Sequence, residues 1–68
     1  MKVREATRLV EADGWSFARQ AGSHRHYKHP VKPGIVTIAG QPNDDLPKGT
    51  VSSILRQAGI KLDKEGNR

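Results

Sequence analysis

The sequence predicts a small α+β domain in which two helices cover one face of a three-stranded antiparallel sheet, in the order α-β-β-β-α. Both ends of the chain carry apolar residues at helical spacing, the middle carries alternating and β-branched residues, and glycine or proline stands at the boundaries. With 68 residues, of which 34% are apolar, the chain can form one core but no enclosed substrate cavity. We expect residues 1–60 to form a single domain and the charged residues 61–68 a flexible tail.

The first helix is predicted over residues 3–13. Val3, Ala6 and Val10 recur on one helical face, and charged residues occupy most of the positions between them. Gly14, followed by an apolar residue, is typical of the end of a helix, because glycine adopts the left-handed conformation there without strain. The pattern therefore predicts a helix with one apolar face and a defined end.

The second helix is predicted over residues 47–58. Pro47 suits the first turn of a helix, where its missing N–H group is not needed. Ile54 and Leu55 belong to an apolar face at helical spacing, and Gly59 repeats the end signal of the first helix.

Three strands are predicted between the helices, over residues 15–20, 24–29 and 35–39. A glycine turn makes the first two a hairpin. We expect Trp15 and Phe17 to share one face of the sheet and to serve the core, although both are also candidates for stacking on a nucleic-acid base. Since the sheet has one face to bury, both helices should pack on that face and leave the other open.

Composition and charge restrict the function. Lys and Arg total 12 against 7 Asp and Glu, a formal net charge of +5, which favours a polyanion or an acidic protein as partner over a role in solubility alone. The chain has no cysteine, which excludes disulfides and thiolate zinc sites. Its longest apolar run is two residues, so we expect no membrane span, no signal peptide and a cytoplasmic location.

The second predicted strand carries the residues with the clearest chemistry. Tyr27 is its only large apolar residue and should face the helices, so alternation places His24, His26 and Lys28 together on the open face. Imidazole exchanges protons near neutral pH, and a nearby ammonium attracts phosphate. RNA supplies its own nucleophile, the 2′-OH, so these groups suffice for cleavage without a metal. The alternative is that the histidines are idle surface residues.

A metal site is another possible use of these histidines. His24 and His26 lie two residues apart on one face, but alternation puts His29 on the other. We therefore expect no metal site and no cofactor.

Two turns supply further candidates. Lys48 and Gly49, at the start of the second helix, favour an RNA-backbone clamp made with the free amides of the first turn, and Thr50 belongs to the same element. The competing interpretation is helix initiation, with Thr50 as the cap. Ser23, in the hairpin turn, is a candidate to orient His24 or bind phosphate, unless it serves the turn alone.

Several short elements of this sequence occur together in one known family. They are Gly14-Trp15, Arg19-Gln20, Gly22-Ser23-His24 followed by Tyr27, His29-Pro30, and Leu46-Pro47-Lys48-Gly49-Thr50 leading to Ile54-Leu55-Arg56-Gln57-Ala58-Gly59-Ile60. Over residues 3–60 the chain resembles the HicA toxins of bacterial and archaeal toxin–antitoxin systems. Where many relatives have a second histidine, this chain has Gln41.

The resemblance implies a fold like the double-stranded-RNA-binding domain (dsRBD) and a small ribonuclease that cleaves mRNA and halts translation and growth. It implies that His24 is catalytic; Ser23, His26 and Lys28 are our auxiliary candidates, and Arg19 joins the RNA-binding candidates. The implied partner is a HicB-type antitoxin that covers the site and usually carries a DNA-binding part, so contact with DNA is indirect.

Two other functions fit the composition. One is a non-catalytic RNA-binding module with a dsRBD-like fold, although such modules normally offer more basic surface on one helix than this chain does. The other is an adaptor whose charge serves an acidic protein partner. Inducible expression distinguishes them from a toxin, because only a toxin arrests growth.

Overall fold

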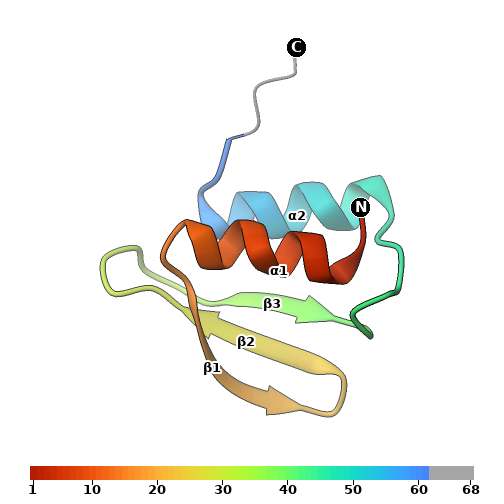
Figure 1. Cartoon of the computed structure of the whole chain (residues 1–68). Coiled ribbons are helices and arrows are strands. Elements are labelled where there is room, and N and C mark those ends of the chain that lie inside the picture. Colours follow the sequence, from red (N-terminus) through yellow and green to blue (C-terminus); the bar gives the residue numbers. More distant parts are fainter. Residues whose placement is uncertain (62–68) are drawn as a thin grey trace.

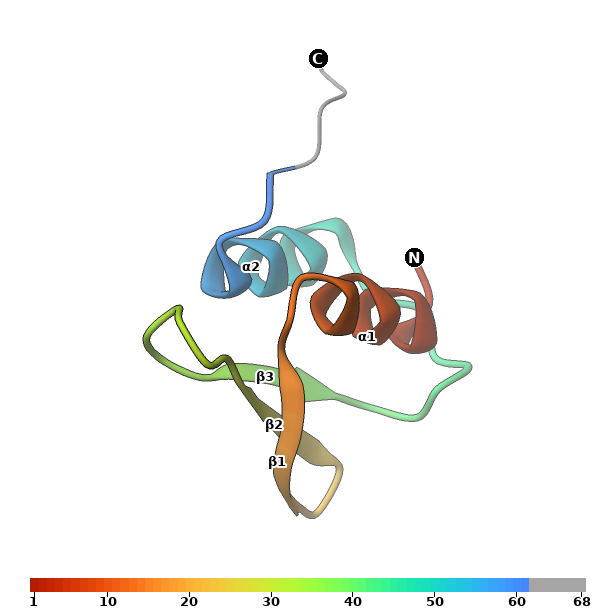
Figure 2. The same ribbon diagram turned by 60° about the vertical axis from the view of Figure 1, so that its left-hand side comes forward.

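A computed structural model of the chain describes residues 1–61, in which two helices lie on one face of a three-stranded sheet (Figures 1 and 2). The elements are α1 (Val3–Ala12), β1 (Ser16–Ala21), β2 (His24–Lys28), β3 (Val36–Ala39) and α2 (Lys48–Ala58). The sheet is antiparallel with the order β1-β2-β3. The predicted α+β class, element order and common helical face are confirmed, and each boundary lies within one residue of its predicted position. Of the tail expected over residues 61–68, all but Lys61 lies outside the described residues.

The core lies between the helices and the sheet. Both helices pack on β3, and their apolar faces meet the inner side of β2 and β3. At about 1.5–3 kcal/mol for each large apolar side chain removed from water, this cluster supplies most of the driving force for folding. Its members are Val3, Ala6, Val10, Trp15, Tyr27, Val36, Ile38, Ile54 and Ala58.

The first strand contributes nothing to this core, which corrects one prediction. Trp15 is 2% exposed, as expected, but Phe17 is 54% exposed and only meets the edge of the Tyr27 ring. The helices pack on β3 at the far edge of the sheet, so the hairpin of β1 and β2 extends past the helical layer (Figure 2). Phe17 therefore points to the helical side of the sheet at a place where no helix covers it.

The ends of the helices follow from the backbone. Gly14, at φ +107°, and Gly59, at φ +67°, adopt the conformations that stop the two helices, as the sequence predicts. Pro47 is the N-cap of α2, and Val51 donates its N–H to the Pro47 carbonyl. Among the described residues no side chain caps this end, so the Thr50 cap of the competing interpretation is wrong. Neither helix within residues 1–61 is long and apolar enough to cross a membrane.

A single lysine in the loop between β2 and β3 joins the carboxyl-terminal ends of both helices. The Lys32 ammonium pairs with the Asp13 carboxylate at the end of α1 and donates to the carbonyls of Ala58, at 3.0 Å, and Gly59, at 3.3 Å, at the end of α2. The buried Trp15 indole also donates to the Ala58 carbonyl, at 3.2 Å. These bonds satisfy carbonyls that a helix end leaves without partners.

His29 also belongs to this junction, where both of its ring nitrogens form hydrogen bonds. Its Nδ1 accepts from the backbone N–H groups of Val31 and Lys32, both at 3.0 Å. Its Nε2 therefore carries the proton and donates to the Asp13 carbonyl at 2.8 Å. The ring also packs edge-on against Trp15, with 5.2 Å between ring centroids. His29 is a structural residue, a role that sequence reasoning missed.

The ion pair predicts how stability responds to acid. The hydrogen bond from Lys32 holds the pKa of Asp13 below its ordinary value, against an opposing effect of burial. A carboxyl whose pKa is lower in the folded state stabilises the fold above the unfolded pKa, and that contribution disappears as the pH falls through the folded pKa.

We therefore expect the free energy of unfolding to fall more steeply in the wild type than in Asp13→Asn below about pH 4. Urea unfolding followed by tryptophan fluorescence at a series of pH values measures both slopes. In a Lys32→Met background, Asp13→Asn should change the slope much less. Equal slopes for the wild type and Asp13→Asn would contradict the assignment.

Candidate functional site

The sheet face that points away from the helices, called the open face below, carries the charged side chains of β2. Tyr27 is buried beneath the helices, and side chains alternate along a strand, so His24, His26 and Lys28 lie on the open face. The register with β3 agrees, because Tyr27 pairs with the buried Val36. This is the arrangement that the alternation predicts.

A β-bulge in β1 adds an arginine to this row. The register of β1 against β2 shifts between Phe17, which pairs with Tyr27, and Arg19, which pairs with His26. Without the shift, Arg19 would share the helical side with Phe17, because residues two apart point to the same face. The extra residue, Ala18, reverses that assignment, as bulges next to functional sites commonly do. Arg19 thus lies directly across from His26 on the open face.

His24 is an exposed residue at the hairpin end of the row. Its neighbours on the adjacent strands are Ala21 in β1 and Ala39 in β3, so only methyl groups flank the imidazole. The hairpin turn beside it is tied to the end of β3, because Gly40 donates its N–H to the Ser23 carbonyl at 3.1 Å. The exposed His24 side chain is therefore open to solvent and to a phosphate group.

His26, in the centre of the sheet, is held more firmly. Its Nδ1 lies 3.0 Å from the Thr37 hydroxyl on β3, and the ring is half-buried. Thr37 is held in turn, since its backbone N–H donates to the Gln57 side chain of α2 at 3.1 Å. Thr37 therefore contacts Nδ1 of the His26 ring and not Nε2. No signal in the local sequence indicates this cross-strand pair.

All formal charges on the open face are positive. The segments that form β1, β2 and β3 contain no Asp or Glu, so the cations of the open face have no carboxylate beside them within the sheet. Arg19 and Lys28 carry fixed charges and both neighbour His26, Arg19 across the strands and Lys28 along β2, while His24 lies at the other end of the row. Such a surface binds the phosphates of a nucleic acid or the carboxylates of a protein.

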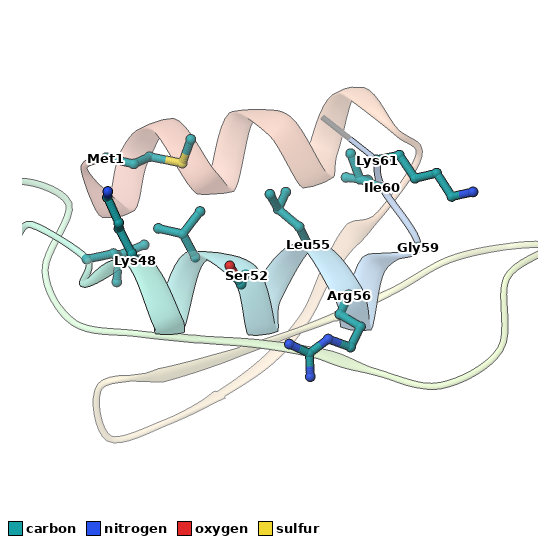
Figure 3. A pocket seen from close by; sticks show the side chains of 10 residues that line it. Met1, Lys48, Ser52, Leu55, Arg56, Gly59, Ile60 and Lys61 are labelled. Atoms are coloured by element: carbon teal, nitrogen blue, oxygen red, sulfur yellow. The ribbon is translucent and has the colours of Figure 1, made fainter. Parts of the chain in front are cut away.

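The other predicted RNA-binding residues lie elsewhere. Lys48, Gly49 and Thr50 form the first turn of α2, in the helical layer on the opposite side of the sheet from the open face (Figures 1 and 2). Lys48 borders a groove that runs along α2 (Figure 3). The structure brings Arg19, Ser23 and the β2 residues together, and does not bring the α2 turn to them.

The three histidines also separate into two places. Both ring nitrogens of His29 form hydrogen bonds at the helix junction, on the other side of the sheet from His24 and His26. Within residues 1–61, no three His, Asp or Glu side chains come close enough together to share a metal ion.

Comparison with known families gives a match over nearly the whole chain. Residues 3–60 match the model of a family described as the HicA toxin of bacterial toxin–antitoxin systems. No curated protein matches the chain. The matched segment runs from the start of α1 to just beyond α2 and so includes the whole open face. The protein therefore belongs to the HicA toxin family, whose members act in toxin–antitoxin pairs.

Proposed function

We propose that this protein is a metal-independent endoribonuclease that cleaves mRNA, arrests translation and growth, and is neutralised by a HicB-type antitoxin. The observation that carries the proposal is the open face, where two imidazoles and two fixed cations lie together without a carboxylate in the sheet. The membership of the toxin family supports the same reading.

The reaction that this face suits is transfer of the phosphoryl group to the neighbouring 2′-oxygen. His24 takes the proton of the 2′-OH while the 2′-oxygen attacks phosphorus. The bond from phosphorus to the 5′-oxygen breaks, and His26 gives a proton to the departing oxygen. The products end in a 2′,3′-cyclic phosphate and a 5′-OH. His24 and His26 are two residues apart on one strand, so their imidazoles are separated by about 7 Å. This separation is enough for a phosphate to bind between them.

The remaining residues have supporting roles in this mechanism. Arg19 and Lys28 stabilise the extra negative charge on the phosphorus oxygens. Thr37 orients His26 by bonding to Nδ1, so Nε2 faces the substrate. The Ser23 hydroxyl, in the turn beside His24, binds a phosphate oxygen. Thr37 is a positioning residue, because it acts through His26.

RNA beyond the cleavage point reaches the start of α2. The hairpin tip with His24 and the first turn of α2 lie at the same end of the molecule (Figure 1). A strand leaving the open face over this end meets the free N–H groups of Gly49 and Thr50 and the ammonium of Lys48. The turn thus acts as a second backbone contact rather than as part of the reacting centre.

The antitoxin acts by covering the open face. Carboxylates of the antitoxin pair with Arg19, Lys28 and the imidazoles, so that RNA and antitoxin compete for one surface. An ordinary interface takes about 800 Å² from each partner, which on a chain this small includes most of the sheet. Contact with DNA takes place only through the antitoxin.

We expect His24→Ala to lower the rate of RNA cleavage by about 100-fold or more, the usual contribution of a general acid or base. Because His24 is exposed, the free energy of unfolding should change by no more than about 0.5 kcal/mol. Cleavage of a labelled RNA and analysis of the product ends measure this, with Arg8→Ala on exposed α1 as the control. A wild-type rate in the folded variant would refute the assignment, and RNA binding by a wild-type protein that never cleaves would favour the non-catalytic module.

Thr37→Val removes the hydroxyl that holds His26 and keeps the shape of the side chain. We expect kcat to fall by about tenfold with little change in KM, and the pH profile of kcat to shift. Thr37→Ser, which retains a hydroxyl, should restore most of the rate. If Val and Ser variants behave alike, Thr37 has no part in positioning His26.

Lys48→Ala should weaken RNA binding evenly across sequences and lower the slope of log K against log salt by about one. Filter binding in the His24→Ala background, where RNA stays intact, gives the slope. Arg56→Ala, at the other end of α2, serves as the control and should leave the slope unchanged. An unaltered slope for Lys48→Ala would mean that this turn only initiates the helix.

A further inference from the structure

The helical layer carries a groove of about 780 Å³ on the side away from the sheet (Figure 3). It runs along α2 beside the start of α1, and the side chains of Met1 and Leu55 extend toward each other across it. The residues that line it are Met1, Leu46, Lys48, Val51, Ser52, Leu55, Arg56, Gly59, Ile60 and Lys61.

The groove exists because α2 has more apolar residues than the core uses. Ile54 and Ala58 are buried against the sheet, with exposures of 2% and 0%. Val51 and Leu55 lie on a neighbouring side of the helix and are only half-buried, and Ile60 continues this surface beyond the end of the helix. A second apolar face on a surface helix is typical of a site that binds another molecule.

The chemistry of the lining favours a protein segment over RNA. The floor is aliphatic, and none of the lining residues is aromatic, so unpaired bases find no ring to stack on. The lining contains three cations, Lys48, Arg56 and Lys61, and no carboxylate. An occupant that complements the groove therefore has aliphatic side chains on one face and carboxylates along its flanks.

We propose that this groove binds an acidic amphipathic helix of the antitoxin. The proposal rests on the proposed function only in assigning the partner as a protein antitoxin. The 11 residues of α2 rise about 16 Å, enough for two turns or three of a partner helix with apolar anchors at positions i, i+4 and i+7. The anchors lie on Val51 and Leu55, and the carboxylates face Arg56 and Lys61.

The groove and the open face lie on opposite sides of the molecule, so they give the antitoxin two attachments. The contact on the open face depends on charge and weakens with salt, whereas the groove contributes an apolar anchor. Once one segment is bound, the other binds as an intramolecular event, which raises the affinity of the pair above that of either segment.

The test measures binding of the cognate HicB-type antitoxin to full-length toxin variants by calorimetry. Arg56→Glu reverses the charge at the exposed edge of the groove, and Leu55→Ala shortens the apolar floor. Each should weaken binding by about tenfold or more. Arg8→Glu makes the same charge change on α1 outside the groove and should leave the affinity unchanged.

Thermal unfolding identifies any loss of affinity that comes from misfolding. If Leu55→Ala proves unstable, Arg56→Glu still tests the proposal, because Arg56 is exposed. Wild-type affinity in Arg56→Glu would overturn the proposal. So would shifts of the Leu55 and Ile60 methyl signals, away from the first turn of α2, on adding RNA, or a concentration-dependent dimer that Arg56→Glu dissociates. RNA or a second copy would then be the occupant. None of these readouts requires cleavage, so failure of the nuclease proposal is seen separately.

Discussion

The negative ends of both helices meet at one place, and the structure depends on how that place is neutralised. α1 and α2 run in the same direction, so their carboxyl-terminal dipoles lie side by side (Figure 1). Lys32 offsets both, His29 donates to the Asp13 carbonyl, and Trp15 shares the Ala58 carbonyl with Lys32. Because this junction anchors the loop after β2, it also sets where β3 begins. The pairing of His26 with Thr37 on the open face follows from that register.

The parts of the fold that local pattern determines were predictable. Helical periodicity with a glycine stop identifies both helices, since propensity and amphipathic burial agree there. The row of His24, His26 and Lys28 was also predictable, because one large apolar residue, Tyr27, decides which side of a regular strand is buried. These inferences need only neighbours in the chain.

The parts of the structure that depend on contacts between distant residues could not be predicted from the sequence. The bulge that turns Arg19 to the open face interrupts the alternation on which a sequence prediction relies. The exposure of Phe17 follows from how far the helices extend over the sheet, which is a property of the whole layer. Likewise, alternation separates His29 from His24 and His26, and only its contacts with Asp13 and the loop show that its role is structural.

The absence of acidic residues from the strands has a kinetic consequence. The carboxylates of residues 1–61 all lie in the helical layer, its turns or the loop that follows β3, so the strands carry only positive charge. An approaching polyanion feels this charge within about one Debye length, roughly 8 Å at physiological salt. The attraction raises the share of encounters that begin on the sheet. The same positive charge speeds the association of an acidic inhibitor. RNA and the inhibitor then compete for the sheet, and their concentrations decide which binds first.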